Sequence, residues 1–151
     1  MLDAVIIGDA NETLLSLPDG HFDLLVCNDF LEHIVDPVGF LSKACTKLIP
    51  GGHFLCSLPN FRYLENLFGI LVRKDFRYMD SGILDYSHLR FFTARSMKRL
   101  FREQGMEVEV FRGINTVKGV MGFFLKLLLW PLNSSDMLHP QFVVLARRRD
   151  A

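Results

Sequence analysis

Residues 17–37 read LPDGHFDLLVCNDFLEHIVDP, and this stretch decides the fold. Pro18-Asp19-Gly20 is typical of a turn, and the apolar run Phe22–Cys27 that follows predicts a buried β-strand. Asp36 and Pro37 then form a strong helix start, with Asp36 as the N-cap and Pro37 at the first helical position. A strand, a polar loop and a helix follow one another closely, which is the pattern of an α/β domain.

The same alternation extends outward in both directions. Further strands are expected at Leu2–Gly8, His53–Leu58, Met106–Arg112 and Gln141–Arg147. Helices are expected at Asn11–Leu17, from Asp36 to a stop at Pro50-Gly51-Gly52, at Phe61–Val72, and from an N-cap at Thr93 to Gly105. Arg73–Arg90 is expected to be irregular. The pattern predicts a single α/β domain over residues 1–151 with a mostly parallel sheet.

Composition narrows the class of protein. The 151 residues carry 17 basic and 17 acidic side chains, and 50% of them are hydrophobic. This excludes an intrinsically disordered chain, and the zero net charge predicts no nucleic-acid partner. Three cysteines without a Cys-x-x-Cys pair predict neither a zinc site nor a disulfide framework, which favours a cytoplasmic protein. The opening MLDAVIIGDA lacks the basic start of a signal peptide.

The charge is unevenly distributed. Residues up to Val72 contain nine acids and three bases, whereas the rest contains eight acids and fourteen bases. Two such halves suggest different ligands, or two faces that attract each other.

Ligands of open α/β sheets bind outside the carboxyl ends of the strands. That rule selects four places in this sequence: Gly8-Asp9-Ala10, the segment from Asn28 to His33, Pro59-Asn60, and the loop around His88. We expect the functional residues there.

Five sequence motifs follow one another along the chain: GDA, LPDGHFDLLVCNDFLEHIVDP, LIPGGHFLCSLPN, DYSHLRFFT and QFVVLARR. Together they resemble the class I S-adenosylmethionine-dependent methyltransferases, and more narrowly the small-molecule branch with the signature Leu-Glu-His-x-x-Asp-Pro. The resemblance runs from Val5 to Arg147. It implies a partial Rossmann-like methyltransferase sheet, mostly parallel with an antiparallel C-terminal strand. It also implies S-adenosylmethionine as cofactor and a small-molecule acceptor.

One part of that family's pattern is absent from this sequence. A glycine-rich loop of the Gly-x-Gly-x-Gly kind and an acid that holds the ribose are missing, and Gly8-Asp9 matches the family's third strand instead. The chain therefore resembles an N-terminally truncated methyltransferase that lacks the first two strands. Either the AVIIGD strand moves beside FDLLVC, or another chain covers the exposed edge.

The resemblance assigns roles to single residues. The cofactor side comprises Asp9, Ala10, Asn28, Asp29 and Leu31, with Asp9 placed to meet the adenine amino group. Asp9 as a turn residue, and Asn28 and Asp29 as an Asx turn, are the structural alternatives. His33 and His88 are the candidate catalytic residues, because a neutral histidine can take a proton from a hydroxyl group during O-methylation.

The acceptor side comprises four more residues, which are Glu32, Asn60, Tyr86 and Arg90. Arg90 can hold an anionic group with two parallel hydrogen bonds. Capping of the loop by Glu32 and His33, and a buried network around His88, are the structural alternatives. No metal is expected, because Glu32 and His33 alone form an incomplete set of ligands.

Residues 117–132 are apolar but carry Lys118 and Lys126. They are too short to span a membrane and are expected to pack in the core or a dimer, with a peripheral membrane contact as the alternative.

Two classes of function are open. The first is methyl transfer to a small acceptor, such as a saccharide or a lipid-linked molecule, impaired in this chain alone. The second is a non-catalytic remnant that acts as a homodimerisation module. A separate polypeptide that supplies the missing glycine loop is a further alternative.

Overall fold

The computed structural model describes residues 4–116, 127, 130 and 135–149. Its helices are α1 (Ala10–Ser16), α2 (Pro37–Lys47), α3 (Leu64–Leu71), α4 (Ala94–Glu103) and the short 3-10 helix η2 (Ser135–Leu138). Its strands are β1 (Phe22–Asn28), β2 (Leu48–Pro59), β3 (Met106–Ile114) and β4 (Gln141–Arg148).

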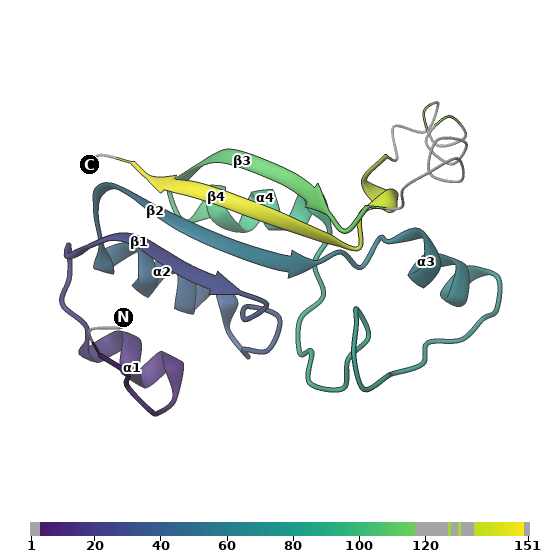
Figure 1. Cartoon of the computed structure of the whole chain (residues 1–151), viewed down its shortest axis with the longest axis horizontal. Helices are drawn as coiled ribbons and strands as arrows, with labels where there is room; N and C mark the ends of the chain where they lie inside the picture. Colours follow the sequence, from purple (N-terminus) through teal and green to yellow (C-terminus); the bar gives the residue numbers. More distant parts are fainter. Residues whose placement is uncertain (1–3, 117–126, 128–129, 131–134, 150–151) are drawn as a thin grey trace.

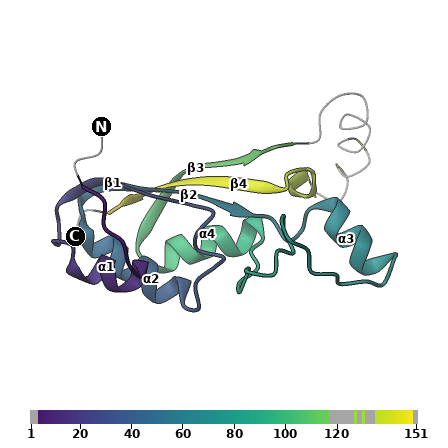
Figure 2. The same ribbon diagram turned by 60° about the horizontal axis from the view of Figure 1, so that its bottom comes forward.

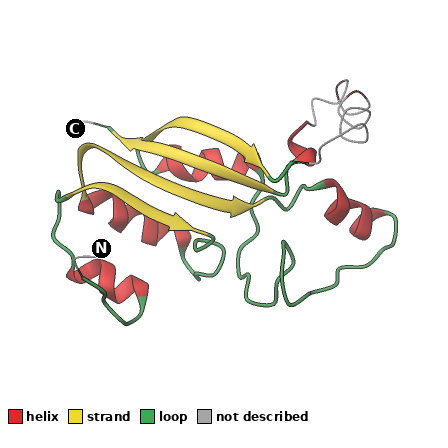
Figure 3. Ribbon diagram, in the orientation of Figure 1, coloured by secondary structure: helices red, strands yellow, loops and turns green. Residues whose placement is uncertain are grey.

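The four strands form one mixed sheet in the order β1-β2-β4-β3 (Figures 1 and 3). β1 pairs with β2 in parallel, and β4 is antiparallel to both β2 and β3. Three strands therefore point the same way and the C-terminal strand opposes them. This confirms the partial Rossmann-like sheet that the sequence predicts.

Helices α1, α2 and α4 all lie on one face of the sheet, as Figure 2 shows. Alternate residues of the central strands, such as Phe54 and Cys56 of β2 and Val144 of β4, point to these helices and are completely buried. No described helix covers the opposite face. Leu24 and Val26 of β1 are about half exposed there, at 49% and 52%. The core is therefore one-sided, and β1 is an edge strand instead of the buried strand that its apolar sequence predicts.

Two predicted helix starts are confirmed at the level of single hydrogen bonds. The Asp36 side chain accepts a hydrogen bond from the backbone N–H of Gly39 at 2.9 Å, and Pro37 opens α2. Thr93 and Ser96 form a reciprocal capping box at the start of α4. Both caps satisfy backbone N–H groups that have no partner inside the helix.

The prediction of a strand at Leu2–Gly8 is wrong for residues 4–8, the part of it that the structure describes. Residues 4–8 form no strand, and the Ile7 side chain is 97% exposed. A strand needs a neighbour for its backbone hydrogen bonds, and no described strand pairs with this segment. The segment does not pair with β1, so that expectation is also wrong.

Other differences are small. α2 ends at Lys47, and Pro50-Gly51-Gly52 therefore lies inside β2 instead of ending the helix. Apart from Leu127 and Trp130, residues 117–132 lie outside the described residues. Within the described part of the chain, no helix has the length and apolar character needed to cross a membrane.

Candidate functional site

Two loops that are distant in sequence meet beyond the carboxyl end of β1. The backbone N–H groups of Leu89 and Arg90 both donate to the carbonyl oxygen of Glu32, at 2.8 and 3.0 Å. The Arg90 guanidinium also donates to the carbonyl oxygen of Val35. These bonds fasten the loop after α3 onto the loop after β1.

This junction brings His33 and His88 together. Their rings meet edge to face, with centroids 4.8 Å apart. Nδ1 of His33 lies 3.2 Å from the carbonyl oxygen of Ser87, and Nδ1 of His88 lies 3.0 Å from that of Ile83. A carbonyl only accepts, so each Nδ1 donates its proton, and in the neutral form of each ring Nε2 carries the lone pair.

Glu32 lies beneath the histidines. It is 1% exposed, and neither carboxylate oxygen has a hydrogen-bond partner among the described residues. Burial raises the pKa of this carboxyl above its usual range, because a buried charge loses its hydration. A buried and unpaired carboxylate is rare in native proteins and indicates an absent partner.

Asp85 shapes the loop that carries His88. Its carboxylate accepts hydrogen bonds from both the backbone N–H and the hydroxyl of Ser87, at 2.8 and 2.5 Å. These bonds to Ser87 lower the pKa of Asp85, because they stabilise the charged form. The turn fixes the Ser87 carbonyl to which His33 is bonded.

The residues expected to bind the cofactor lie in two places, at the start of α1 and at the end of β1. Asp9 is the N-cap of α1 and accepts hydrogen bonds from the backbone N–H groups of Asn11 and Glu12. Ala10 is the first residue of that helix. No described hydrogen bond links these two residues to the loop after β1.

The other cofactor candidates follow β1. Asn28 and Asp29 are exposed where the strand ends. Asp29 has a positive φ of 48°, its N–H donates to Ser57, and its carboxylate accepts from the side chain of Gln141. Leu31 is 0% exposed and belongs to the core cluster, so it presents no surface to a ligand in this conformation.

Two acceptor candidates differ sharply in accessibility. Asn60 is 0% exposed, and its amide donates to the carbonyl oxygens of Asp136 and His139, both at 2.8 Å. Its side chain is therefore engaged in tying β2 to the segment before β4. Tyr86 is 68% exposed and stacks on Tyr78. Asn60 thus has a structural task, whereas Tyr86 is open to a ligand.

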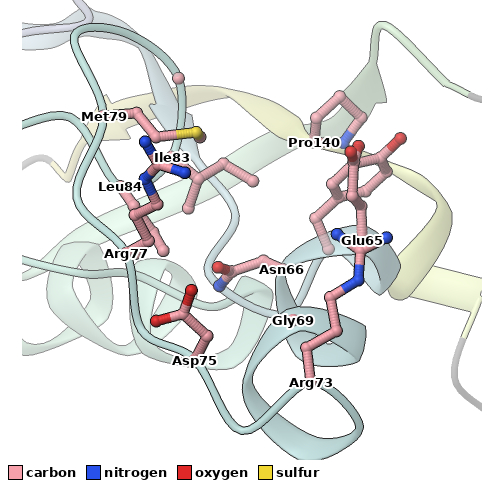
Figure 4. A pocket seen from close by; sticks show the side chains of 12 residues that line it. Glu65, Asn66, Gly69, Arg73, Asp75, Arg77, Met79, Ile83, Leu84 and Pro140 are labelled. Atoms are coloured by element: carbon pink, nitrogen blue, oxygen red, sulfur yellow. The ribbon is translucent and has the colours of Figure 1, made fainter.

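A cavity of about 460 Å³ lies between α3 and the loop that follows it (Figure 4). Met79, Ile83 and Leu84 line one side, and Glu65 of α3 and Arg73, just beyond the end of α3, line the other. The remaining lining residues are Tyr63, Asn66, Gly69, Asp75, Arg77, Gly82 and Pro140. Ile83 links the cavity to the histidines, because its carbonyl holds His88.

The sequence did not single out this cavity. Its charged residues stand in a segment without helix or strand periodicity, where no regular pattern marks a shared face. The nearest available signal was the run of Arg, Asp and aromatic residues from Arg73 to Tyr78. Phe61, Phe76 and Phe91 pack together beside it and support the loop.

Sheet order, one-sided helices and a polar site at the carboxyl ends define an α/β domain of the ligand-binding Rossmann-like class. The family described as "Methyltransferase domain" matches residues 3–109. The chain therefore belongs to the methyltransferase domain family, and S-adenosylmethionine is the cofactor of that family.

Relatives agree with this assignment. A ubiquinone biosynthesis O-methyltransferase of Cupriavidus pinatubonensis is 30% identical over 107 residues, which are 70% of this chain and 42% of that protein. The chain thus spans less than half the length of this curated relative.

Solved structures support the fold. A SAM dependent methyltransferase from Archaeoglobus fulgidus superimposes with a TM-score of 0.62 at 16% identity, over 95% of this chain and 66% of that one. A Burkholderia thailandensis 1,6-didemethyltoxoflavin-N1-methyltransferase, with bound 1,6-didemethyltoxoflavin and S-adenosylhomocysteine, gives 0.53 at 16% identity, over 88% of this chain and 46% of that one.

Proposed function

We propose that this chain serves in the transfer of a methyl group from S-adenosylmethionine to an oxygen atom of a small acceptor. The observation that carries the proposal is the histidine pair, His33 and His88, whose Nε2 lone pairs are free beyond the carboxyl end of β1. Such a lone pair can accept the proton of an acceptor hydroxyl. The O-methyltransferase name of the Cupriavidus relative supports oxygen as the acceptor atom.

The residues present fit part of the cofactor. Asn28 and Asp29 are exposed at the end of β1, where a carboxylate and an amide suit a cationic sulfonium. Asp9 offers a second exposed carboxylate at the start of α1. When bound, S-adenosylmethionine would supply the methyl group, and the side chains of these residues would orient it.

We expect the chain alone to bind the cofactor weakly. The 151 residues contain no Gly-x-Gly-x-Gly loop. Each charge-assisted hydrogen bond that is missing removes about 1.5–3 kcal/mol of binding energy. Because about 1.4 kcal/mol is a tenfold change in affinity, two or three such bonds weaken binding by orders of magnitude. Methyl transfer by the chain alone is impaired for the same reason.

The acceptor would occupy the cavity beside His88. Arg73 and Arg77 bring positive charge to its lining, Glu65 and Asp75 bring negative charge, and Met79 brings apolar surface. A small molecule with an apolar body and polar groups fits this combination. Tyr86 and Arg90 are exposed two residues to either side of His88, and they would contact the part of the acceptor outside the cavity. We keep the prediction that the acceptor is a saccharide or a lipid-linked molecule.

Isothermal titration of the chain with S-adenosylmethionine, which carries the sulfonium that Asp29 would face, tests the cofactor side. We expect weak, saturable binding that Asp29→Asn reduces severalfold. The control is Asp23→Asn, which removes an exposed carboxylate from the same strand at a distance from its carboxyl end. Absence of heat at millimolar ligand, or equal affinities of the two variants, would contradict the proposal.

A second function is favoured by the uncovered face of the sheet. Leu24 and Val26 stand exposed on β1, and the same face carries the pair of Arg147 and Glu109 at 3.1 Å. We infer that a second copy of the chain covers this face, because a surface with both charge signs can match itself across a two-fold axis. Light scattering at high concentration tests this. A dimer that Val26→Lys dissociates is expected, and a strictly monomeric wild type would exclude it.

A further inference from the structure

Three metal-ligating side chains converge at the junction of the two loops. One carboxylate oxygen of Glu32 and one ring nitrogen each of His33 and His88 all lie within 4.8 Å of one another. Glu32 and His33 come from the loop after β1, whereas His88 comes from the loop before α4. The sequence suggested no metal because two adjacent ligands are too few, and the fold supplies the third.

The buried carboxylate is the observation that points to a ligand. Glu32 is 1% exposed and lies under the two histidines, with neither oxygen hydrogen-bonded to a described residue. Buried charges in proteins are paired or coordinate metals. The neighbouring rings offer no hydrogen to this carboxylate, because each donates its Nδ1–H to a backbone carbonyl.

The histidines are held as metal ligands are held. A ligating histidine typically donates its other ring N–H to a carbonyl or carboxylate, which fixes the tautomer and the direction of the ring. Here the carbonyl oxygens of Ser87 and Ile83 accept those bonds at 3.2 and 3.0 Å. With Nδ1 of each ring engaged in this way, Nε2 of the neutral ring is the atom left to bind an ion, and the carboxylate of Glu32 has no hydrogen-bond partner among the described residues.

We propose that Glu32, His33 and His88 bind a divalent transition-metal ion of the zinc type. Two histidines and one carboxylate are the protein ligands of catalytic zinc sites that keep a fourth position open. Ligand atoms in a tetrahedral zinc site lie about 3.4 Å apart, so small side-chain rotations would close the present cluster. Imidazole ligands suit zinc or cobalt, whereas magnesium and calcium prefer oxygen ligands only.

The open position gives the ion a role that rests on the proposed function. It would accept an oxygen atom of water or of the acceptor, next to the cavity that Ile83 joins to His88. With the ion bound, the histidines would no longer act as the base. The ion would instead favour loss of the proton from a coordinated acceptor hydroxyl, and that proton would pass to solvent water. Binding of the ion itself does not depend on methyl transfer.

Titration of the EDTA-treated and desalted chain with Co²⁺ tests the site, because cobalt bound to imidazole absorbs visible light. We expect one ion per chain, displaced by Zn²⁺ and not by Mg²⁺. His88→Gln and Glu32→Gln should each lower the affinity at least about tenfold. The control His21→Gln removes an exposed histidine outside the cluster and should leave the affinity unchanged.

Two results would overturn the proposal: no saturable cobalt band in the wild type, or equal affinities of the wild type and His88→Gln. Circular dichroism of each variant shows that it is folded, and Glu32→Gln keeps the side-chain shape. Calorimetric titration with S-adenosylhomocysteine is run in parallel. Metal binding without cofactor binding would contradict only the proposed function. Cofactor binding without metal binding would contradict only the metal site.

Discussion

The rings of His33 and His88 meet edge to face with centroids 4.8 Å apart, although α2, β2 and α3 separate them along the chain. No direct hydrogen bond between the rings holds this contact. Backbone atoms hold it, through the Glu32 carbonyl that accepts from Leu89 and Arg90, and the Ser87 carbonyl that faces His33. The candidate site therefore depends on the conformation of the loop from Asp85 to Arg90.

Asp85→Ala should loosen this loop. The substitution removes the acceptor for both the N–H and the hydroxyl of Ser87, while the Asp85 backbone stays in place. We expect faster deuterium uptake in peptides covering residues 85–90 and unchanged uptake in α4. Ser87→Ala is the matched control, because it removes the hydroxyl and keeps the N–H bond. Equal uptake in Asp85→Ala and the wild type would show that other contacts set the turn.

Asn60→Ala should destabilise the whole fold. The amide is fully buried and donates to the carbonyl oxygens of Asp136 and His139, two half-buried residues, and after its loss the Asp136 carbonyl keeps the N–H of His139 as a donor at 3.3 Å. A decrease of about 1–3 kcal/mol in unfolding free energy is expected, as for one polar group left without its partner. Urea unfolding measures it. Asn28→Ala, which changes an exposed amide at the end of β1, is the control. If Asn60→Ala lowered ligand affinity and left the unfolding free energy unchanged, Asn60 would be an acceptor-binding residue and not a structural one.

The sequence predicted most of the architecture because its signals are local. Asp36 before Pro37 and Thr93 three residues before Ser96 mark helix starts through bonds within one turn, and both appear as expected. Leu2–Gly8 failed for the opposite reason. Its apolar composition fits a strand, but a strand exists only where a neighbour pairs with it, and none of the described strands does.

The candidate site was predictable only in part. The carboxyl-end rule selected both the segment with Glu32 and His33 and the loop of His88. Their contact depends on hydrogen bonds between Glu32 and residues of a distant, irregular loop, which no periodicity reveals. The convergence of Glu32, His33 and His88 was missed for that reason, and so was the cavity beside Ile83.

Thr93→Ala should weaken α4 from its first turn. The Thr93 hydroxyl accepts from the Ser96 N–H at 3.2 Å, and the Ser96 hydroxyl lies 2.9 Å from the Thr93 N–H. Loss of such a cap costs about 0.5–2 kcal/mol of stability. Thermal unfolding measures it, with Ser42→Ala on the exposed side of α2 as control. The double variant Thr93→Ala and Ser96→Ala should lose less than the sum of the two, because both belong to one box. Strict additivity would argue against reciprocal capping.

Asp19→Asn should remove a pH-dependent contribution to stability. Lys47 donates to the Asp19 carboxylate at 2.6 Å and to the Leu17 carbonyl at 2.8 Å, and its side chain is 8% exposed. Hydrogen bonds from Lys47 and Thr46 lower the pKa of Asp19 from 3.8. A lowered folded-state pKa stabilises the fold above the unfolded value of 3.8, and that stability disappears as the pH falls through the folded value.

The wild type should therefore have a higher urea midpoint than Asp19→Asn at pH 7. The difference should shrink below pH 3.8, where the carboxyl takes up its proton. Asp23→Asn, in the exposed part of β1, is the control and should show no such trend. A difference that stays constant from pH 7 down to acid would contradict the ion pair as its cause.

Gly52→Ala should disturb the parallel pairing that carries the loop of Glu32. A Cβ at this position would lie 3.0 Å from the carbonyl oxygen of Ile49, 3.1 Å from that of Phe22 and 3.3 Å from that of Asp23. Backbone atoms of a paired strand cannot move aside singly, so β1 must shift away from β2. We expect a loss of about 1–3 kcal/mol in unfolding free energy, as for other overpacked sites.

Gly69→Ala in α3 is the opposite case, because its Cβ would meet one atom at 3.8 Å and alanine favours helices by about 1 kcal/mol. Urea unfolding of the two variants should therefore move in opposite directions. If Gly52→Ala were as stable as the wild type, the close approach of β1 to β2 at this point would be refuted.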